Sequence, residues 1–402
     1  MILTAAASAA QAEAERRKVM GGRRLLFLLA GVVTACFLAA CSSQADTLNE
    51  QGLTYYSQGA YQDAVNTFER AIAADHQKPE YHVNKGMAYL EMEDYDNAHS
   101  SFDSALRLDG ACQMACRGNG IAFMEQGLYE EAMAALNAAL ACEAGRAGEA
   151  EYDILLYRGE TQTRMGDYGG AVDTYTVLLE TKGQSSELYY LRGVANIKNG
   201  LTEAGTADMN RAIGLNETDY NLYLNCYYCL ADAGQEELGI GYLQKALTVS
   251  ESTTASHKAR GTIHFLLGDY SAALSEFEYE KEKADVDTWI YIGLCYQSAG
   301  DYESSNAAFA KALENGGENA EVYYQMGMCM FSMKNYEAAL EDLIKGLELG
   351  GGTHKQEMLY TQALCYERLE RFSEALQVFE SYAALYGSDE ELDREMAFLR
   401  TR

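Results

Sequence analysis

The sequence predicts an all-α fold, a solenoid of about ten antiparallel helix pairs followed by a C-terminal capping helix. Three observations predict it. Small residues recur with a period of 34, a second small residue follows each of them after twelve positions, and the 402 residues contain one proline. This period is typical of helical hairpins that bury their apolar faces only by stacking on their neighbours. The 48% of hydrophobic residues excludes a disordered chain.

The first forty residues have the features of a secretory signal. Arg23 and Arg24 precede an apolar run from Leu25 to Ala40. Its 16 residues fall short of the ~20 that a membrane-spanning helix needs. The run ends in Leu38-Ala39-Ala40-Cys41, which resembles the lipobox of bacterial lipoproteins. The resemblance implies cleavage before Cys41 and lipid on that cysteine, so residues 1–40 would be the signal peptide and residues 41–46 a lipidated tether.

Two alternatives accompany this interpretation. Val33-Thr34-Ala35-Cys36 fits a lipobox loosely, but it lies inside the apolar core. The run could also be an uncleaved signal anchor, against which its length argues. Residues 1–19 match no part of a signal, so we expect translation to start at Met20.

The two small positions of the repeat mark where the paired helices touch. The first is glycine in eight of ten units, and the second is alanine, glycine or serine in all ten. Helices that cross closely leave no room there for a larger side chain. A glycine also ends several first helices, where a left-handed residue is needed. An aromatic residue four places after the second small position fills the space between hairpins, as Phe68, Phe102, Phe277, Phe309 and Phe379 do.

The units resemble the tetratricopeptide repeat, whose pattern has an aromatic residue at position 4, Gly at 8, Tyr at 11, a small residue at 20, an aromatic at 24 and Ala at 27. The eighth unit carries all six, as Trp289, Gly293, Tyr296, Ser305, Phe309 and Ala312. The proline of position 32 is absent throughout. The resemblance implies a right-handed superhelix whose first helices line a concave, protein-binding face.

The predicted solenoid covers residues 45–389. Its ten repeats are residues 45–78, 79–112, 113–146, 152–185, 186–219, 220–253, 254–285, 286–319, 320–353 and 356–389. Ser388-Asp389-Glu390-Glu391 then forms a capping-box pattern, and Leu392, Met396 and Leu399 follow at i, i+4 and i+7. Residues 388–402 are therefore predicted to be the capping helix.

The charge and the motifs exclude several function classes. With 60 acidic against 31 basic residues the net charge is −29, which argues against nucleic acid as a partner. The sequence contains no HExxH, Walker loop, GxSxG or SxxK motif. We expect no enzymatic activity, no metal and no cofactor.

Seven of the eight cysteines after Cys41 fall into two groups. Cys229, Cys295, Cys329 and Cys365 share repeat position 10, a small buried position on the first helix, so we expect them to be packing residues. Cys116 and Cys142 lie at the two ends of one hairpin, which meet in an antiparallel pair. They are predicted to form a disulfide in an oxidising compartment, with Cys112 as the competing partner.

The resemblance places repeat positions 5, 9 and 12 on the concave face, as a stripe at i, i+4 and i+7 of each first helix. Here these positions are mostly apolar or aromatic. In no unit does a basic residue at position 5 accompany Asn at position 9, the family's grip on a terminal carboxylate. We expect the groove to take protein or peptide segments with apolar anchors and basic flanks. Its candidate residues are Met87, Met124, Tyr190, Tyr228, Ile290, Tyr324, Met328, Phe331 and Tyr360.

Two points about this stripe stay open at the level of sequence. A tightly curled superhelix, or a homodimer, would bury it. Position 2 is acidic in seven units, which fits either carboxylates at helix N-termini or a negative rim beside the groove. The seven residues are Asp46, Glu80, Asp153, Glu187, Asp287, Glu321 and Glu357.

These observations leave two hypotheses for the function. The first is an extracytoplasmic lipoprotein, anchored to a bacterial membrane, that acts as a protein-binding scaffold or adaptor. The second is an accessory lipoprotein for secretion, pilus or cell-envelope assembly, either pilotin-like or recruiting a hydrolase.

Overall fold

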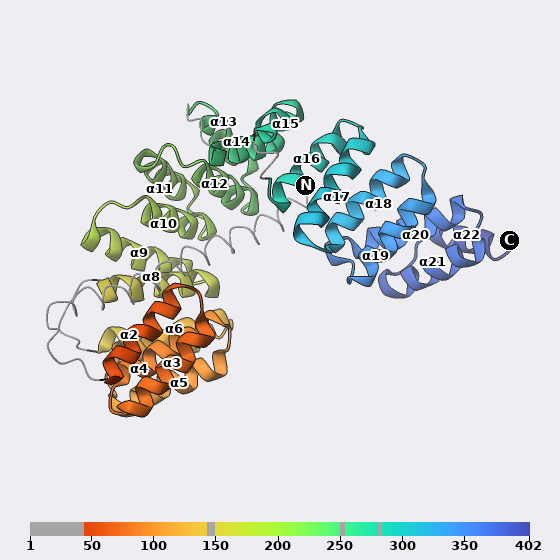
Figure 1. Ribbon diagram of the computed structural model, residues 1–402. Coiled ribbons are helices and arrows are strands. Elements are labelled where there is room, and N and C mark those ends of the chain that lie inside the picture. Colours follow the sequence, from red (N-terminus) through yellow and green to blue (C-terminus); the bar gives the residue numbers. More distant parts are fainter. Residues whose placement is uncertain (1–43, 143–148, 250–253, 280–283) are drawn as a thin grey trace. The chain divides into compact units, whose positions relative to one another are not determined.

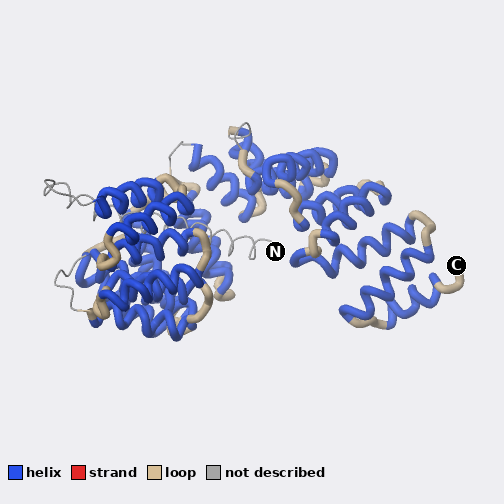
Figure 2. The backbone as a smooth tube through the Cα atoms, turned by 60° about the horizontal axis from the view of Figure 1, so that its bottom comes forward, coloured by secondary structure: helices blue, strands red, loops and turns tan. Residues whose placement is uncertain are grey.

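The computed structural model describes residues 44–142, 149–249, 254–279 and 284–402. Over these ranges the chain consists of helices and loops, which confirms the all-α prediction (Figures 1 and 2). The predicted signal, its start at Met20, Cys36 and Cys41 lie outside the described residues. None of the described helices is both long and apolar enough to cross a bilayer. The chain divides into two compact units, up to Gly239 and from Ile240 onward.

The first unit consists of consecutive antiparallel helix pairs, each packed on the next. The pairs are α2 (Gln44–Ser57) with α3 (Tyr61–Ala74), α4 (Pro79–Glu91) with α5 (Tyr95–Leu108), α6 (Gln113–Glu125) with α7 (Tyr129–Ala141), α8 (Glu149–Met165) with α9 (Tyr168–Lys182), and α10 (Ser186–Lys198) with α11 (Thr202–Leu215). Helix α12 (Tyr220–Asp232) follows, and the boundary between the two units falls within α13 (Glu236–Ala246).

The second unit repeats the same arrangement and ends on a single helix. Its helices are α14 (Thr254–Leu266) with α15 (Tyr270–Glu278), α16 (Val286–Ser298) with α17 (Tyr302–Gly316), α18 (Ala320–Ser332) with α19 (Tyr336–Glu348), α20 (Lys355–Arg368) with α21 (Phe372–Tyr386), and α22 (Glu390–Leu399).

The first small position of the repeat is where the second helix packs on the first. A Cβ atom added to Gly86 would lie 2.6 Å from the ring of Phe102, and one added to Gly293 would lie 2.6 Å from the ring of Phe309. Both rings are completely buried. The expected close crossing of the helices is therefore present, and a methyl group at either glycine would overlap the ring.

The turn inside each hairpin needs a left-handed residue, and glycine does not always supply it. Gly300 has φ 77°, but Glu93, Lys334 and Glu370 adopt φ of 58–61° in the second, ninth and tenth pairs. A residue with a Cβ atom is strained in this region, so the stacking of the paired helices holds these three turns in place.

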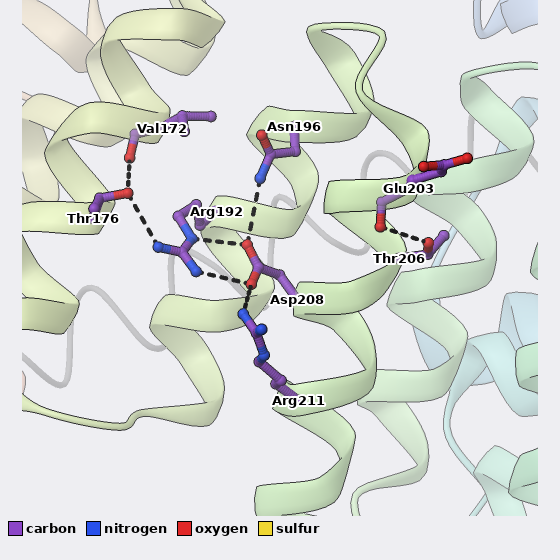
Figure 3. Close-up of polar contacts among 8 residues, drawn as sticks. All are labelled: Val172, Thr176, Arg192, Asn196, Glu203, Thr206, Asp208 and Arg211. Carbon is purple, nitrogen blue, oxygen red and sulfur yellow. Dashed lines mark hydrogen bonds and ion pairs between the residues drawn. The ribbon is translucent and has the colours of Figure 1, made fainter.

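Ion pairs also tie together neighbouring helices of the first unit. Arg192 of α10 contacts both carboxylate oxygens of Asp208 on α11, at 2.8 and 2.9 Å, and donates to Thr176 of α9 at 3.1 Å (Figure 3). Arg211 reaches the same carboxylate at 3.0 Å. Asp208 is 3% exposed, so its carboxylate is paired rather than solvated and joins α10 to α11, while Arg192 extends the link to α9.

Helix α22 covers the end of the second unit. Leu392, Met396 and Leu399 are buried and pack in one apolar cluster with Ala363 and Phe379, as their spacing predicts. The N-cap is Asp389, whose Oδ1 accepts from the backbone N–H groups of Glu391 and Leu392 at 3.0 and 2.8 Å. The N-cap is thus one residue later than the capping box from Ser388 predicts, and its N3 residue, Leu392, has no side-chain acceptor to complete a box.

Candidate binding site

The predicted groove residues of the first unit are largely enclosed. Met87 and Met124 are each 1% exposed and belong to an apolar core that extends from α2 to α8. Contact with a ligand would require these helices to separate. The alternative that the solenoid buries its own stripe therefore holds at these two positions, and we remove both from the candidate site.

Further along the first unit the stripe is half-buried. Tyr190 of α10 directs its hydroxyl toward the backbone carbonyl of Asn225 on α12, at 3.5 Å. Tyr228 of α12 contacts the ring of Tyr227 edge-on, with 5.3 Å between the centroids. Both rings stay partly accessible, so this part of the stripe is neither core nor open surface.

In the second unit none of the candidate residues is fully buried. Ile290, Met328 and Phe331 are half-buried. Phe331 packs edge-on against Tyr336 at the start of α19, at 5.5 Å, and the sulfur of Met328 lies 3.9 Å from the hydroxyl of Thr361 on α20. Ile290 lies on α16, and Met328 and Phe331 lie on α18, the next first helix. All three keep part of their apolar surface in water.

Tyr324 takes part in a cluster that the sequence did not predict. Its ring stacks on His354 with 4.3 Å between the centroids, and His354 Nε2 lies 2.7 Å from Glu321 Oε1. Thr353 donates to the other Glu321 oxygen at 3.2 Å, and Glu357 lies 3.9 Å from the histidine. Burial raises the pKa of Glu321, and His354 opposes this rise.

Two residues more than the period of 34 separate the ninth repeat from the tenth, next to Gly350-Gly351-Gly352. This insertion places His354 beside Tyr324 and Glu321. Gly351 has a left-handed backbone with φ 78°, and the chain then makes the short 3-10 turn η2 (Gly352–His354) before α20. The signal available in the sequence was this glycine-rich insertion between the ninth and tenth repeats.

A pocket of about 260 Å³ lies where α20, α21 and α22 meet. Tyr360 of α20, which is 39% exposed, lines it together with Tyr382 and Tyr386 of α21. The remaining lining residues come from the turn and the start of α22: Gly387, Ser388, Asp389, Glu391 and Leu392. Tyr360 is thus the one predicted groove residue that lines this pocket. The other two tyrosines of the pocket, Tyr382 and Tyr386, are spaced i and i+4, and this spacing was the sequence signal for their shared helix face.

Several position-2 carboxylates make contacts beyond their own repeat. Asp153 pairs with Arg117, which is completely buried. Asp46 accepts a hydrogen bond of 2.5 Å from Tyr81, and Glu321 pairs with His354 as described. Asp46 and Glu321 lie in the first turn of α2 and α18, as the helix N-terminus interpretation expects. In addition, Asp46 and Asp153 join successive first helices, and Glu321 joins α18 to η2.

The predicted disulfide cysteines lie close together as thiols. Cys116 is buried, and burial together with the neighbouring Cys142 raises the pKa of its thiol to about 11. Burial also raises the pKa of the Cys112 thiol, and the neighbouring Cys142 contributes to this rise. All three are free in this structure, so the disulfide stays a prediction. Cys295, Cys329 and Cys365 are completely buried, as expected for packing residues, whereas Cys229 is half-buried.

Within the described ranges, no three His, Cys, Asp or Glu side chains are placed to hold a metal ion. Tetratricopeptide repeat models match residues 83–151, 292–350 and 357–388, and a TPR repeat model matches residues 52–93. Stretches of both units therefore match the tetratricopeptide repeat in sequence. No curated protein sequence matches the chain.

Solved structures with similar folds are distant in sequence. A tetratricopeptide repeat protein from Parabacteroides merdae is 18% identical, with 63% of this chain and 98% of that one covered and a TM-score of 0.43. Yeast Tom70 is 16% identical, with coverage of 89% and 95% and a TM-score of 0.37. YrrB, described as a TPR protein with an unusual peptide-binding site, is 16% identical, with coverage of 48% and 97% and a TM-score of 0.37.

Proposed function

We propose that this chain is a protein-binding scaffold that lies outside the cytoplasm, is anchored to a bacterial membrane by lipid on Cys41, and uses the second unit as its binding site. The observation that carries the proposal is the partly exposed apolar stripe on α16, α18 and α20, made of Ile290, Tyr324, Met328, Phe331 and Tyr360. Accessible apolar and aromatic side chains in a row are the anchors that helix-in-groove partners use. The carboxylates around them favour partners with basic flanks.

The proposed site is tested by the double substitution Tyr324→Glu with Tyr360→Glu. Partners are crosslinked to the full chain in membranes of the source organism and identified by mass spectrometry. We expect the double variant to lose the partners that the unmodified chain retains. Tyr279→Glu is the matched control, because Tyr279 is 72% exposed, lies just after α15 outside the stripe, and stacks on His257 as Tyr324 stacks on His354.

Tyr324 stacks on His354, so its substitution could also disturb the fold. Circular dichroism of the double variant therefore shows whether the loss of a partner comes from the binding site or from unfolding. If the folded double variant retains every partner, the stripe is not the binding site. Partners that are secretion or pilus subunits would favour the accessory role, and varied soluble ligands would favour the scaffold.

The anchor is proposed from the sequence motif and from the start of the first helix. Helix α2 begins at Gln44, three residues after Cys41. Three extended residues span at most about 11 Å, so the first repeat would lie against the membrane. Acylation at more than one position gives stable anchoring.

We expect Cys41→Ser to abolish incorporation of labelled palmitate and to leave an uncleaved precursor, visible as a larger band. Cys36→Ser is the control and should be labelled normally. Continued labelling of the Cys41→Ser chain would show that the lipid is attached elsewhere.

A further inference from the structure

The pocket between α20, α21 and α22 has aromatic walls. The rings of Tyr360 and Tyr382 contact edge-on with 5.6 Å between their centroids, and Tyr382 and Tyr386 are 5.3 Å apart. Gln356 donates to the Tyr382 hydroxyl at 2.8 Å, and Phe379 supports the ring of Tyr360 at 5.5 Å. The three tyrosines are thereby fixed by their neighbours and line one cavity.

Carboxylates surround this aromatic wall. Asp389 and Glu391 line the pocket directly. Burial raises the pKa of Tyr360, and Glu391, Asp389, Tyr382 and Glu395 raise it further, so the negative charge of these acids reaches the ring. Burial raises the pKa of Glu367 on α20, and Glu395 raises it further. The electrostatic surroundings of the cavity are therefore acidic.

The helix N-terminus at this site does not make the pocket an anion site. Asp389 Oδ1 already accepts from the N–H groups of Glu391 and Leu392. Asp389, Glu390, Glu391 and Asp393 add negative charge to the same turn. An incoming phosphate or carboxylate would meet these acids, whereas a cation would meet both the carboxylates and the tyrosine rings.

We propose that this pocket binds the cationic end of a lysine or arginine side chain that a partner protein presents. Aromatic rings attract a cation through their quadrupole, and nearby carboxylates compensate its charge. The volume of about 260 Å³ is below the roughly 300–1,000 Å³ of pockets for drug-sized ligands, and it suits a single side chain. The proposal rests on the proposed function in one respect, namely that the side chain comes from a partner protein. The pocket would then be the place where the scaffold contacts the basic flank of that partner.

The test uses the full chain labelled with 3-fluorotyrosine and followed by fluorine NMR. Substitution of Tyr360, Tyr382 and Tyr386 by Phe, one at a time, assigns their resonances. The probes are N-acetyl-lysine methylamide, its arginine equivalent and N-acetyl-norleucine methylamide, which has an apolar side chain without the charge. We expect saturable shifts at these three resonances with the two cationic probes, weakened by salt, and none with norleucine.

Charge variants separate electrostatics from packing. Glu391→Gln should weaken the binding of the lysine probe about threefold or more, and Asp389→Asn should do the same while keeping the N-cap. Glu303→Gln, an exposed acid on α17, is the control and should leave the affinity unchanged. Equal shifts with norleucine, no saturable shift with the cations, or no effect of Glu391→Gln beyond the control would each overturn the proposal.

The probes distinguish this inference from the proposed function, since they bind without any partner. If the probes fail but partner capture still depends on Tyr324 and Tyr360, the pocket proposal alone falls. If the probes bind but no partner depends on the stripe, the pocket proposal stands and the proposed function falls.

Discussion

Single residues decide how closely the paired helices approach. Gly293 lies under the ring of Phe309, where a Cβ atom would come within 2.6 Å of the ring. Gly241, in the middle of α13, has open space around the same position. The same residue type thus has a packing role at one site and none at the other.

This contrast predicts opposite effects of the same substitution. Gly293→Ala should lower the free energy of unfolding by about 1–3 kcal/mol, because the added methyl group overlaps a buried ring. Gly241→Ala should raise it by up to about 1 kcal/mol, because alanine favours an exposed helix. Urea unfolding followed by circular dichroism measures both, and equal effects would refute the assigned role of Gly293.

Asp342 of α19 is a buried carboxylate that costs stability at neutral pH. Burial raises its pKa to about 6; Lys345 lowers it and Glu341 raises it. The folded chain therefore binds this proton more tightly than the unfolded chain, whose aspartate titrates near 3.8. The stability that this group contributes is present below about pH 4, falls as the pH rises toward 6, and is absent above it.

Replacement of this carboxylate should reverse the loss. At pH 7, Asp342→Asn should raise the free energy of unfolding by about 1–2 kcal/mol, a value reduced for partial solvent screening. The gain should be much smaller at pH 4, because the folded aspartate is then protonated and the unfolded one, with a pKa near 3.8, is close to half protonated. Urea unfolding at pH 4, 5.5 and 7 tests this, and a gain independent of pH would contradict the assigned titration.

At the scale of the element, the final helix depends on its first turn. Asp389 caps α22 through two backbone N–H groups, whereas Ser388 makes no such contact among the described hydrogen bonds. Asp389→Ala should lower the free energy of unfolding by about 1 kcal/mol, and Ser388→Ala should leave it nearly unchanged. Thermal unfolding of the two variants tests which residue is the cap, and the reverse ranking would restore the capping box expected from the sequence.

The pair α6 and α7 carries the predicted disulfide. Cys116 and Cys142 lie side by side at the open end of this hairpin, next to Cys112. Under oxidising conditions we expect a Cys116–Cys142 bond to form without displacement of the helices. Peptide mapping without reductant should recover this pair, and Cys142→Ser should leave Cys116 available to Cys112. Recovery of all three as free thiols would reject the bond.

At the scale of the whole molecule, the net charge of −29 shapes the encounter with partners. A peptide with apolar anchors and lysine flanks should associate about tenfold faster at 50 mM than at 500 mM salt. A glutamate-flanked peptide with the same anchors should bind much more weakly. Fluorescence anisotropy with stopped flow measures both, and association that does not depend on salt would remove the electrostatic part of the proposed function.

The helical hairpins could be predicted from the sequence because their signals are local. Gly293 and Phe309 lie 16 residues apart in one repeat, and the same pattern recurs along the chain. The apolar face of α22 was equally predictable from Leu392, Met396 and Leu399. These positions report contacts within one hairpin or between adjacent helices, which a period of 34 is sufficient to reveal.

The tertiary structure alone decided which parts of the stripe stay accessible. Met87 and Tyr360 occupy equivalent faces of their first helices, yet one is 1% exposed and the other 39%. Likewise, Asp153 pairs with a buried arginine of the preceding repeat, and Asp389 meets the tyrosines only because α22 docks on α20 and α21. Helical periodicity identifies the face of a helix, but its exposure depends on neighbours that stack from elsewhere in the chain.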